Sequence, residues 1–570
     1  MVYGSGYASA DDVVGHELAH GVTDFSAHLF YYYQAGAINE SLSDVFGELI
    51  DQSDGRGNDT AAVRWQMGED LPIGAIRDMR DPTAFNDPDR IQSPNYFSGP
   101  EDRGGVHFNS GVNNKAAFLM TDGGVFNGRT VTALGLTKTA KINYEAQSNM
   151  LTSGSDYNDL YHILPQACNQ LVGTIGITVA NCVNHVAAVI ATQMNLQPTT
   201  GVFHPEAPIC AAGQVPTDLF YDNLENTASG NWTKGRIQGA SNWAYPQSPN
   251  DYPGYDATVA TSGKYNMWGD NPETTADFWI GKAVGVTVPA GKQTFLRFKH
   301  LYEFESGFSS NYDGGVIEYS INNGASWVDA GSLFKSAGDW GYQGSIASGL
   351  GNPLGGRQGY VGRSDGYFSS RATLTELAGK SVRFRYRIGA DGSIGSYGWY
   401  LDDLRVYTCA APVAPPPTTN KLQNPGFELD NNDDGRLDFW SWDSSALRMP
   451  TVKRTGQYAL WLRAVDNQPF VFGQTVTGLT QGTTYTTQRY FNIPATTKLV
   501  NARLEIKWRN SANAIISTTI VKAYTDDNAG VWQFASVATV APTATNNARV
   551  QLVVNGLSST VYVDDLVFRP

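Results

Sequence analysis

The sequence predicts a multidomain protein, in which a mainly α-helical lobe is followed by two all-β jelly-roll sandwiches. Apolar residues recur at helical spacing over the first 200 residues, and short alternating runs replace them from about residue 205. A proline-rich stretch, APVAPPPTTN, then divides the β-rich part in two. The 570 residues also exceed a single core, since a domain usually holds roughly 150 residues. We therefore expect four parts: a helical lobe, a sandwich, a linker and a second sandwich, at residues 1–197, 205–409, 410–420 and 421–570.

Amphipathic patterns predict helices throughout the lobe, with loops rich in Gly, Asp and Pro between them. The segments with this pattern are residues 11–30, 38–52, 109–124, 156–172 and 178–195. Asp11 and Asp12 stand at the start of the first helix, where their side chains can cap its free N–H groups.

Alternating apolar and polar residues predict the strands of both sandwiches. The clearest runs are residues 294–304, 315–322, 381–389 and 398–408, and then 456–464, 470–479, 502–510, 548–556 and 561–568. The last run of each sandwich contains an Asp-Asp pair, in WYLDDLRVY and in VYVDDLVF. The pattern favours a sandwich for each region.

Charge and cysteine content restrict the class of protein. The net charge of −14 argues against a nucleic-acid partner and indicates a solubilising surface, to which calcium binding is a modest addition. No apolar run reaches the roughly 20 residues of a membrane span. The four cysteines form no CxxC motif, and their even number in β-rich sequence favours disulfides and an oxidising compartment. We expect the pairs Cys168–Cys182 and Cys210–Cys409, the latter joining the first and last strands of the first sandwich.

The run VVGHELAHGVTDF carries the first functional pattern. His16 and His20 are four residues apart, so a helix places both imidazoles on one face, with Glu17 between them. A catalytic zinc site takes three protein ligands and leaves one position open for water. The bare HExxH pattern also occurs by chance on helices, so the third ligand must decide.

The extended pattern HExxHxxGxxH is absent, because Thr23 and Ser26 occupy its Gly and His places. Instead, INESLSD follows, with Glu40 twenty residues beyond His20. A second helix antiparallel to the first would bring Glu40 to the metal. Asp44, one turn further, would then accept the free N–H of a ligand histidine.

Four motifs together resemble the thermolysin (M4) family of neutral zinc metallopeptidases. They are VVGHELAHGVTDF, AGAINESLSDVFGELI, DPTAFNDPDRI and GGVHFNSGVNNKAAF, and their order and spacing are held across about 195 residues. The resemblance implies that His16, His20 and Glu40 bind one zinc ion and that Glu17 is the general base. It also implies cleavage of protein or peptide substrates before bulky hydrophobic residues.

The same resemblance implies a role for each of the remaining site residues: Tyr31 and His107 stabilise the oxyanion, Asp102 orients His107, Arg77 holds a substrate carbonyl, Asn39 and Asp44 support the zinc ligands, and Val13 forms a wall of the S1′ pocket. Three of these residues also have an alternative interpretation without a catalytic role. His107 is then an ordinary loop histidine, Tyr31 one of 29 tyrosines, and Arg77 the ion-pair partner of Asp78 or Asp81.

Structural calcium is the second cofactor that the resemblance implies. Asp12, Asp51 and Glu69 match its calcium ligands, whereas Arg64 and Gln66 stand where further acidic ligands are expected. We therefore expect one calcium site rather than a double one. The alternative is an acidic surface without an ion.

The chain begins at MVYGSGY, which resembles a segment inside the family's catalytic unit. The family carries a β-rich N-terminal lobe, a propeptide and a signal peptide before this point, and MVYGSGYASADD lacks the features of a signal. We therefore expect a fragment of a secreted, monomeric protein. Its cleft would lack one wall, which leaves the activity of this chain open.

The two sandwiches resemble accessory modules. GGVIEYSINNGASWVDAG and SYGWYLDDLRVYTC resemble MAM-like sandwiches of secreted bacterial proteases, including immune inhibitor A-like ones, which implies a scaffold or accessory binding role. NPGFELDNNDDGRLDFWSW and VYVDDLVF resemble a carbohydrate-binding, galactose-binding-like jelly roll. There, Trp440 and Trp442 either stack on a glycan or lie in the core.

A calcium loop is also expected in the second sandwich, from Asp430, Asn432, Asp434 and Asp438, although the absence of a glutamate at the twelfth position argues against an EF-hand. The main hypothesis is thus a secreted zinc endopeptidase with two β-sandwich modules. The alternative is a non-catalytic protein that binds glycans or proteins and retains a remnant peptidase lobe.

Overall fold

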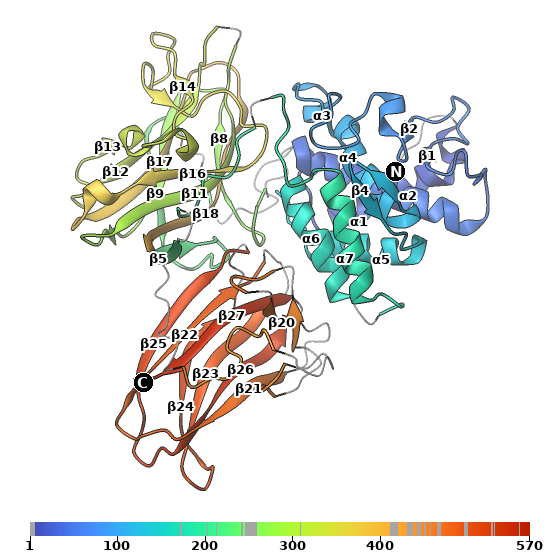
Figure 1. The fold of residues 1–570 in the computed structure, drawn as a ribbon. Coiled ribbons are helices and arrows are strands. Elements are labelled where there is room, and N and C mark those ends of the chain that lie inside the picture. Colours follow the sequence, from blue (N-terminus) through green and yellow to red (C-terminus); the bar gives the residue numbers. More distant parts are fainter. Residues whose placement is uncertain are drawn as a thin grey trace. The chain divides into compact units, whose positions relative to one another are not determined.

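The computed structural model describes most of the 570 residues. The described ranges are 6–171, 174–201, 203–211, 214–240, 243–245, 259–307, 309–410, 420–429, 437–441, 446–449, 452–456, 458–463, 469–494, 500–525, 528, 530–557 and 559–570. The chain forms two compact units, one of Met1–Ile209 with Asp218–Tyr407 and one of Cys210–Thr217 with Thr408–Pro570. Figure 1 shows helices first and then β-sheets along the sequence, which confirms the predicted fold class.

The helical lobe contains these helices: α1 (Asp11–Asp24), α2 (Tyr33–Asp54), α3 (Glu101–Asn109), α4 (Gly111–Asp122), α5 (Leu136–Asn149), α6 (Tyr157–Gln170) and α7 (Val179–Ala191). It also holds the short strands β1 (Gln66–Met67), β2 (Arg77–Asp78), β3 (Gly124–Phe126) and β4 (Arg129–Val131). Its core lies around Ile38 and Leu42 of α2, which are fully buried. The disulfide Cys168–Cys182 joins α6 to α7.

Two details of α1 differ from the expectation. Its N-cap is Ala10, and Asp11 and Asp12 lie within the first turn, where their charge faces the positive end of the helix dipole. The helix ends at Asp24 rather than at residue 30. His28 adopts φ 53°, a left-handed conformation that a helix does not accept, so residues 25–32 form a loop between α1 and α2.

Two glycines let α1 and α2 approach each other closely. A Cβ at Gly47 would lie 2.4 Å from the backbone oxygen of Asp12, and one at Gly15 would lie 3.0 Å from the Cα of Gly47. The contact at Gly47 is closer than a Cβ atom allows, and the contact at Gly15 is tighter than most Cβ contacts. Because the helices touch here, residues one turn away on either helix are brought within contact distance of each other.

The first sandwich consists of two sheets. One has the order β13-β12-β17-β9-β6, with β10 beside β17, and the other has the order β16-β11-β18-β8-β7, with β5 beside β18. The strands are β5 (Val215–Asp222), β6 (Trp232–Gln238), β7 (Trp243–Ala244), β8 (Met267–Asn271), β9 (Ala276–Lys282), β10 (Val286–Thr287), β11 (Gln293–Glu303), β12 (Gly314–Ser320), β13 (Val328–Asp329), β16 (Phe368–Thr373), β17 (Ser381–Ala390) and β18 (Ser396–Ala410). A small hairpin adds β14 (Gly344–Ser345) and β15 (Gln358–Gly359). The disulfide Cys210–Cys409 ties the segment before β5 to the end of β18.

The second sandwich has sheets of order β19-β20-β27-β22-β25 and β21-β26-β23-β24. Its strands are β19 (Ala446–Met449), β20 (Ala459–Arg463), β21 (Phe470–Thr477), β22 (Thr484–Asn492), β23 (Val500–Arg509), β24 (Ile515–Tyr524), β25 (Gln533–Val540), β26 (Asn547–Leu557) and β27 (Thr560–Arg569). Trp440 lies in the core, stacked on Phe472, and its indole N–H donates to the backbone oxygen of Asn424. The glycan-stacking interpretation of Trp440 is therefore wrong.

Most residues of the expected calcium loop, together with Trp442 and the linker, cannot be compared with the structure. Trp442, Asp430, Asn432, Asp434 and linker residues 411–419 lie outside the described residues. Asp438 is described and partly buried.

The Asp-Asp pair has one structure in both sandwiches. Asp402 accepts hydrogen bonds from the backbone N–H groups of Thr261 and Ser262, at 2.8 and 3.1 Å. Asp564 accepts from those of Arg454 and Thr455, at 2.9 and 3.1 Å. In each pair the first aspartate thus binds a loop to the last strand. Among the described residues, no helix is long and apolar enough to cross a bilayer.

Candidate metal centre and active site

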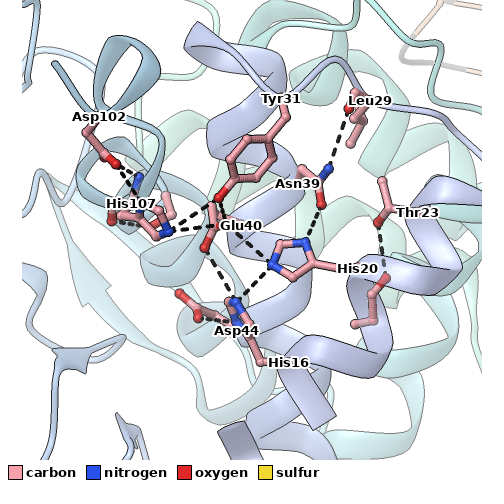
Figure 2. Close-up of polar contacts among 12 residues, drawn as sticks. His16, His20, Thr23, Leu29, Tyr31, Asn39, Glu40, Asp44, Asp102 and His107 are labelled. Atoms are coloured by element: carbon pink, nitrogen blue, oxygen red, sulfur yellow. Dashed lines mark hydrogen bonds and ion pairs between the residues drawn. The ribbon is translucent and has the colours of Figure 1, made fainter. Parts of the chain in front are cut away.

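Three side chains from α1 and α2 converge on one point, as Figure 2 shows. The Nε2 atoms of His16 and His20 lie 3.0 Å apart. The carboxylate of Glu40 lies 3.5 Å from His16 Nε2 and 3.4 Å from His20 Nε2. The helical spacing of the histidines and the close contact of α1 with α2 together produce this arrangement.

The outer nitrogens of both histidines are engaged. His16 Nδ1 lies 2.8 Å from Asp44 Oδ1, and His20 Nδ1 lies 2.8 Å from Asn39 Oδ1. With each Nδ1–H donating outward, the two Nε2 lone pairs face each other at a distance that favours a cation between them. Glu40 Oε2 is also buried without a hydrogen-bond partner among the described residues. Two imidazoles and a carboxylate fit the ligand preference of Zn²⁺.

The carboxylates of Glu40 and Asp44 lie beside side chains that stabilise their negative charge. Burial would raise the pKa of Glu40, but its contact with His20 and the charges of His16 and His107 lower that pKa to about 2. Burial would likewise raise the pKa of Asp44, yet the guanidinium of Arg77 holds it well below its usual range. The carboxylates are thus ionised and paired at neutral pH.

Arg77 lies on β2 and forms a bidentate ion pair with Asp44. Its Nε and Nη2 groups donate to Asp44 Oδ2 and Oδ1, at 2.9 and 2.6 Å. Asn114 of α4 also donates to Asp44 Oδ2 at 2.8 Å. The plainer interpretation, in which Arg77 pairs with Asp78 or Asp81, is wrong, because the guanidinium turns toward α2.

A cleft of about 390 Å³ opens over this cluster. Its lining residues are His16, Glu17, His20, Asp24, Leu29, Tyr31, Asn39, Glu40 and His107. Glu17 is exposed at the edge of the cleft, next to the two histidines in sequence. Val13 lies one turn earlier, in a small apolar cluster with Ala10, Met67 and Leu71.

Two hydrogen-bond donors face the cluster, Tyr31 from the loop between α1 and α2 and His107 from α3 (Figure 2). The hydroxyl of Tyr31 hydrogen-bonds to Glu40 Oε1 and lies 3.3 Å from His107 Nε2. Burial raises the pKa of the Tyr31 phenol, so its proton stays in place at physiological pH. His107 Nδ1 lies 2.6 Å from Asp102 Oδ1, and the backbone N–H of His107 donates to Asp102 Oδ2.

The segment that carries Asp102 and His107 is an irregular helix. Residues 102–105 all have positive φ, at 50°, 51°, 83° and 80°. Only Gly104 and Gly105 adopt such angles without cost, so Asp102 and Arg103 are strained. The tight turn directs the Asp102 carboxylate back onto His107. The motif GGVH contains the required glycines, but the strain at Asp102 has no sequence signal.

A second group of carboxylates lies at the other end of α1 and α2. Asp12 and Asp51 are buried, and Asp51 Oδ2 and Glu48 Oε1 have no hydrogen-bond partner among the described residues. Burial, with contacts to Asp11 and Asp59, raises the pKa of Asp51 to about 9, and burial near Asp12 raises that of Glu69 to about 7. The unpaired oxygens of Glu48 and Asp51 are of the kind that Ca²⁺ prefers. Asp12, Asp51 and Glu69 are not, however, among the described groups whose ligand atoms lie within 4.8 Å of one another, and Asp12 accepts hydrogen bonds from the backbone N–H groups of Val13 and Gly68.

Sequence reasoning missed a further group of carboxylates, in the first sandwich. Oxygens of Glu305, Asp313 and Asp391 lie within 4.8 Å of one another. Burial raises the pKa of Asp313 to about 6. Asp391 is distant in sequence from Glu305 and Asp313, and the three residues share no motif, so the fold is needed to bring them together.

The fold and the cluster define a helical lobe of the HExxH metallopeptidase class. Residues 27–189 match the family described as thermolysin metallopeptidase, alpha-helical domain. The helical part of this chain is therefore a thermolysin-like (M4) lobe, as the sequence motifs predicted.

Comparisons with known proteins agree for this part of the chain. A zinc metalloproteinase from Renibacterium salmoninarum is 46% identical over 199 residues, which are 34% of this chain and 36% of that protein. Thermolysin from Alicyclobacillus acidocaldarius subsp. acidocaldarius is 41% identical over 186 residues, 30% of this chain and 33% of the relative. The chain thus spans about a third of the length of these curated relatives.

Solved structures add two matches. The precursor of protealysin, a metalloproteinase from Serratia proteamaculans, is 28% identical with a TM-score of 0.26, covering 33% of this chain and 58% of that one. A family 16 carbohydrate binding module is 17% identical with a TM-score of 0.22, covering 26% of this chain and 100% of that one.

Proposed function

We propose that this chain carries the catalytic centre of a secreted zinc-dependent endopeptidase, with His16, His20 and Glu40 as the zinc ligands. The observation that supports this most is the convergence of a buried carboxylate with the Nε2 atoms of two imidazoles, each imidazole being oriented by a partner on α2. When bound, zinc supplies Lewis-acid chemistry: it polarises a carbonyl and lowers the pKa of a water molecule.

Glu17 is the general base in this proposal. Its carboxylate accepts a proton from the attacking water, whose oxygen bonds to the carbonyl carbon of the substrate. The same proton then passes to the leaving nitrogen as the C–N bond breaks. The exposed position of Glu17, at the edge of the cleft and between the two histidines in sequence, supports this role.

Tyr31 and His107 donate hydrogen bonds to the oxyanion that forms during attack. Asp102 binds Nδ1 of His107 and so directs Nε2 toward Tyr31 and Glu40. Asp44 and Asn39 hold the zinc-binding histidines in their tautomers. Arg77 anchors Asp44, and in this proposal its remaining N–H groups bind a substrate carbonyl.

Three finer proposals remain. The enzyme prefers bulky hydrophobic residues after the scissile bond, with Val13 in the pocket wall. Asp12, Asp51 and Glu69 bind one structural calcium ion, because buried carboxylate oxygens and raised pKa values indicate excess negative charge there. The chain divides into the lobe 1–197 and the sandwiches 205–409 and 421–570.

The first test measures zinc content and cleavage of a peptide containing a Gly-Leu bond, with and without a zinc chelator. We expect one zinc per chain and cleavage that disappears with the metal. Glu17→Gln keeps the side-chain volume and removes the base, so it should lower kcat by about 100-fold or more while zinc stays bound. Cleavage that survives in Glu17→Gln would exclude this mechanism, and a chain without zinc would favour the binding-protein alternative.

A further inference from the structure

We propose that the first sandwich is part of the catalytic unit, and that Tyr397 on its strand β18 is a positioning residue for Tyr31. This inference rests on the proposed function. It follows from contacts within the unit that holds both the helical lobe and the first sandwich.

Tyr31 lies at the tip of a tight turn between α1 and α2. The backbone N–H of Tyr32 donates to the oxygen of Phe30 at 2.7 Å, which leaves Tyr31 between them. From this tip the phenol reaches Glu40 and His107. The position of the hydroxyl is therefore set by the two residues that flank it.

Both flanking side chains pack on the same residue of β18. The ring centroid of Tyr397 lies 5.0 Å from that of Tyr32 and 5.8 Å from that of Phe30, the latter edge to face. Tyr400, which is fully buried, lies 6.1 Å from Phe30. Aromatic contacts at these distances are specific in geometry, so they hold the turn as well as burying it.

The backbone of the turn is also tied to the sandwich. Phe30 N–H donates to the oxygen of Ser153 at 2.8 Å. Ser153 Oγ in turn accepts from the N–H of Ala260, and Gly154 N–H donates to the oxygen of Ala260, both at 2.8 Å. The next two residues after Ala260 are held by the buried Asp402 of β18.

The His107 segment is braced from the same side. Arg363 of the sandwich donates to the backbone oxygen of Ser98 at 3.2 Å, just before that segment. The ring of Tyr33, next in sequence to Tyr32, lies under Gly104, where a Cβ would be 2.3 Å from it. The two oxyanion donors thus lie on segments that the sandwich supports, the Tyr31 turn and α3.

The mechanism predicts a kinetic effect without loss of metal. Hydrogen bonds to an oxyanion act only when their donors are pre-placed, and a misplacement of about 1 Å costs up to about 100-fold. Tyr397→Ala should lower kcat by about tenfold with little change in KM or zinc content. Tyr397→Phe, which keeps the ring, should restore kcat.

A double-mutant cycle separates positioning from general destabilisation. In the Tyr31→Phe background the hydroxyl is already gone, so Tyr397→Ala should lower kcat less than twofold further. The matched control is Tyr319→Ala on β12, in the other sheet of the same sandwich. Tyr319→Ala also removes a tyrosine ring. At temperatures below the unfolding transition of this variant, kcat should be unchanged.

The outcomes distinguish this inference from the proposed function. If the native chain shows no zinc-dependent cleavage, the proposed function fails first. If it cleaves, and Tyr397→Ala matches Tyr319→Ala or lowers kcat equally with and without the Tyr31 hydroxyl, the positioning role is wrong. Loss of zinc in Tyr397→Ala would also overturn it.

Discussion

The same pair of helices builds two clusters of carboxylates with opposite electrostatics. Along the contact of α1 with α2, Glu40 and Asp44 lie beside histidines and Arg77, whereas Asp51 lies among other acids. The pKa of Glu40 is about 2, and that of Asp51 is about 9. The carboxylates of the first cluster have histidines and an arginine beside them. The carboxylates of the second cluster lie mainly beside one another, which is the arrangement that a cation from solution would stabilise.

The largest expected effect comes from removing a ligand of the first cluster. His16→Ala deletes a nitrogen from a three-ligand set, so zinc binding and peptide cleavage should both be lost. Metal analysis after dialysis and a peptide assay check this. His162→Ala on α6 removes the same side chain elsewhere in the lobe and should retain zinc. A His16→Ala protein with full zinc occupancy would show that the cluster is not the metal site.

A smaller effect should follow Asp44→Asn, which keeps shape but removes charge. The Arg77 side chain, which is 13% exposed, then loses its counter-ion, which costs about 3 kcal/mol of unfolding free energy. His16 loses a strong acceptor, which weakens zinc binding by roughly 10-fold to 100-fold. Chemical denaturation and zinc titration measure the two losses.

The double variant Asp44→Asn with Arg77→Met should recover part of the stability but not the zinc affinity. If stability and zinc affinity recovered equally, Asp44 would contribute only to the stability of the fold and would have no separate role in orienting His16.

Calcium removal should act on the second cluster and leave the first unchanged. If the ion is normally present at about 100 times its Kd, its removal costs about 2.7 kcal/mol. The calcium-free protein should also become less stable as pH rises from 6 to 9. The pKa values of Asp51 and Glu69 are raised in the folded state, so the folded chain holds protons that the unfolded chain has released, and this stability is lost as pH passes about 7 and then about 9.

Thermal unfolding at pH 6 and 9, with and without calcium, tests this. Calcium should abolish most of the slope, because a bound cation replaces the protons. Glu40 has the opposite sign: its depressed pKa contributes stability that is lost only in acid, as pH falls toward about 2. If the calcium-free protein lost no stability between pH 6 and 9, the pKa values of Asp51 and Glu69 would not be raised in the folded state, and the contrast with Glu40 would be wrong.

The smallest and most specific effect is expected for Asp51→Asn, which should shift the unfolding temperature in opposite directions with and without calcium. Without calcium the neutral amide relieves repulsion, so the variant should unfold at a temperature a few degrees above that of the native chain. With calcium it lacks a ligand oxygen of full charge and should unfold at a lower temperature than the native chain. The same order in both conditions would exclude calcium binding at Asp51.

Local spacing determined how much of the site could be predicted. HELAH and INESLSD give the ligands because helical periodicity fixes where their side chains point. The pairing of Arg77 with Asp44 could not be read from sequence, because it depends on where β2 lies against α2. For the same reason the cluster of Glu305, Asp313 and Asp391 was missed, because these residues lie just outside strands β11, β12 and β17, which belong to two different sheets.

The limits of the fold prediction have similar causes. Strands with strict alternation were found, and α5 was overlooked because LTKTAKINYEAQSN has few large apolar residues. Helix α1 was drawn too long, since its apolar spacing continues past Asp24 into the loop that carries Tyr31. Composition alone could not decide whether Trp440 faces sugar or core.

The Cys210–Cys409 disulfide, with its sequence separation of 199 residues, turns the first sandwich into a covalent ring. A single backbone cut anywhere between those cysteines leaves both pieces attached. If the proposed peptidase activity acts on this chain itself, a nick in a loop of this ring would not release the second sandwich. Electrophoresis of a self-digested sample should then show one full-size band until a reductant is added, and two shorter bands afterwards.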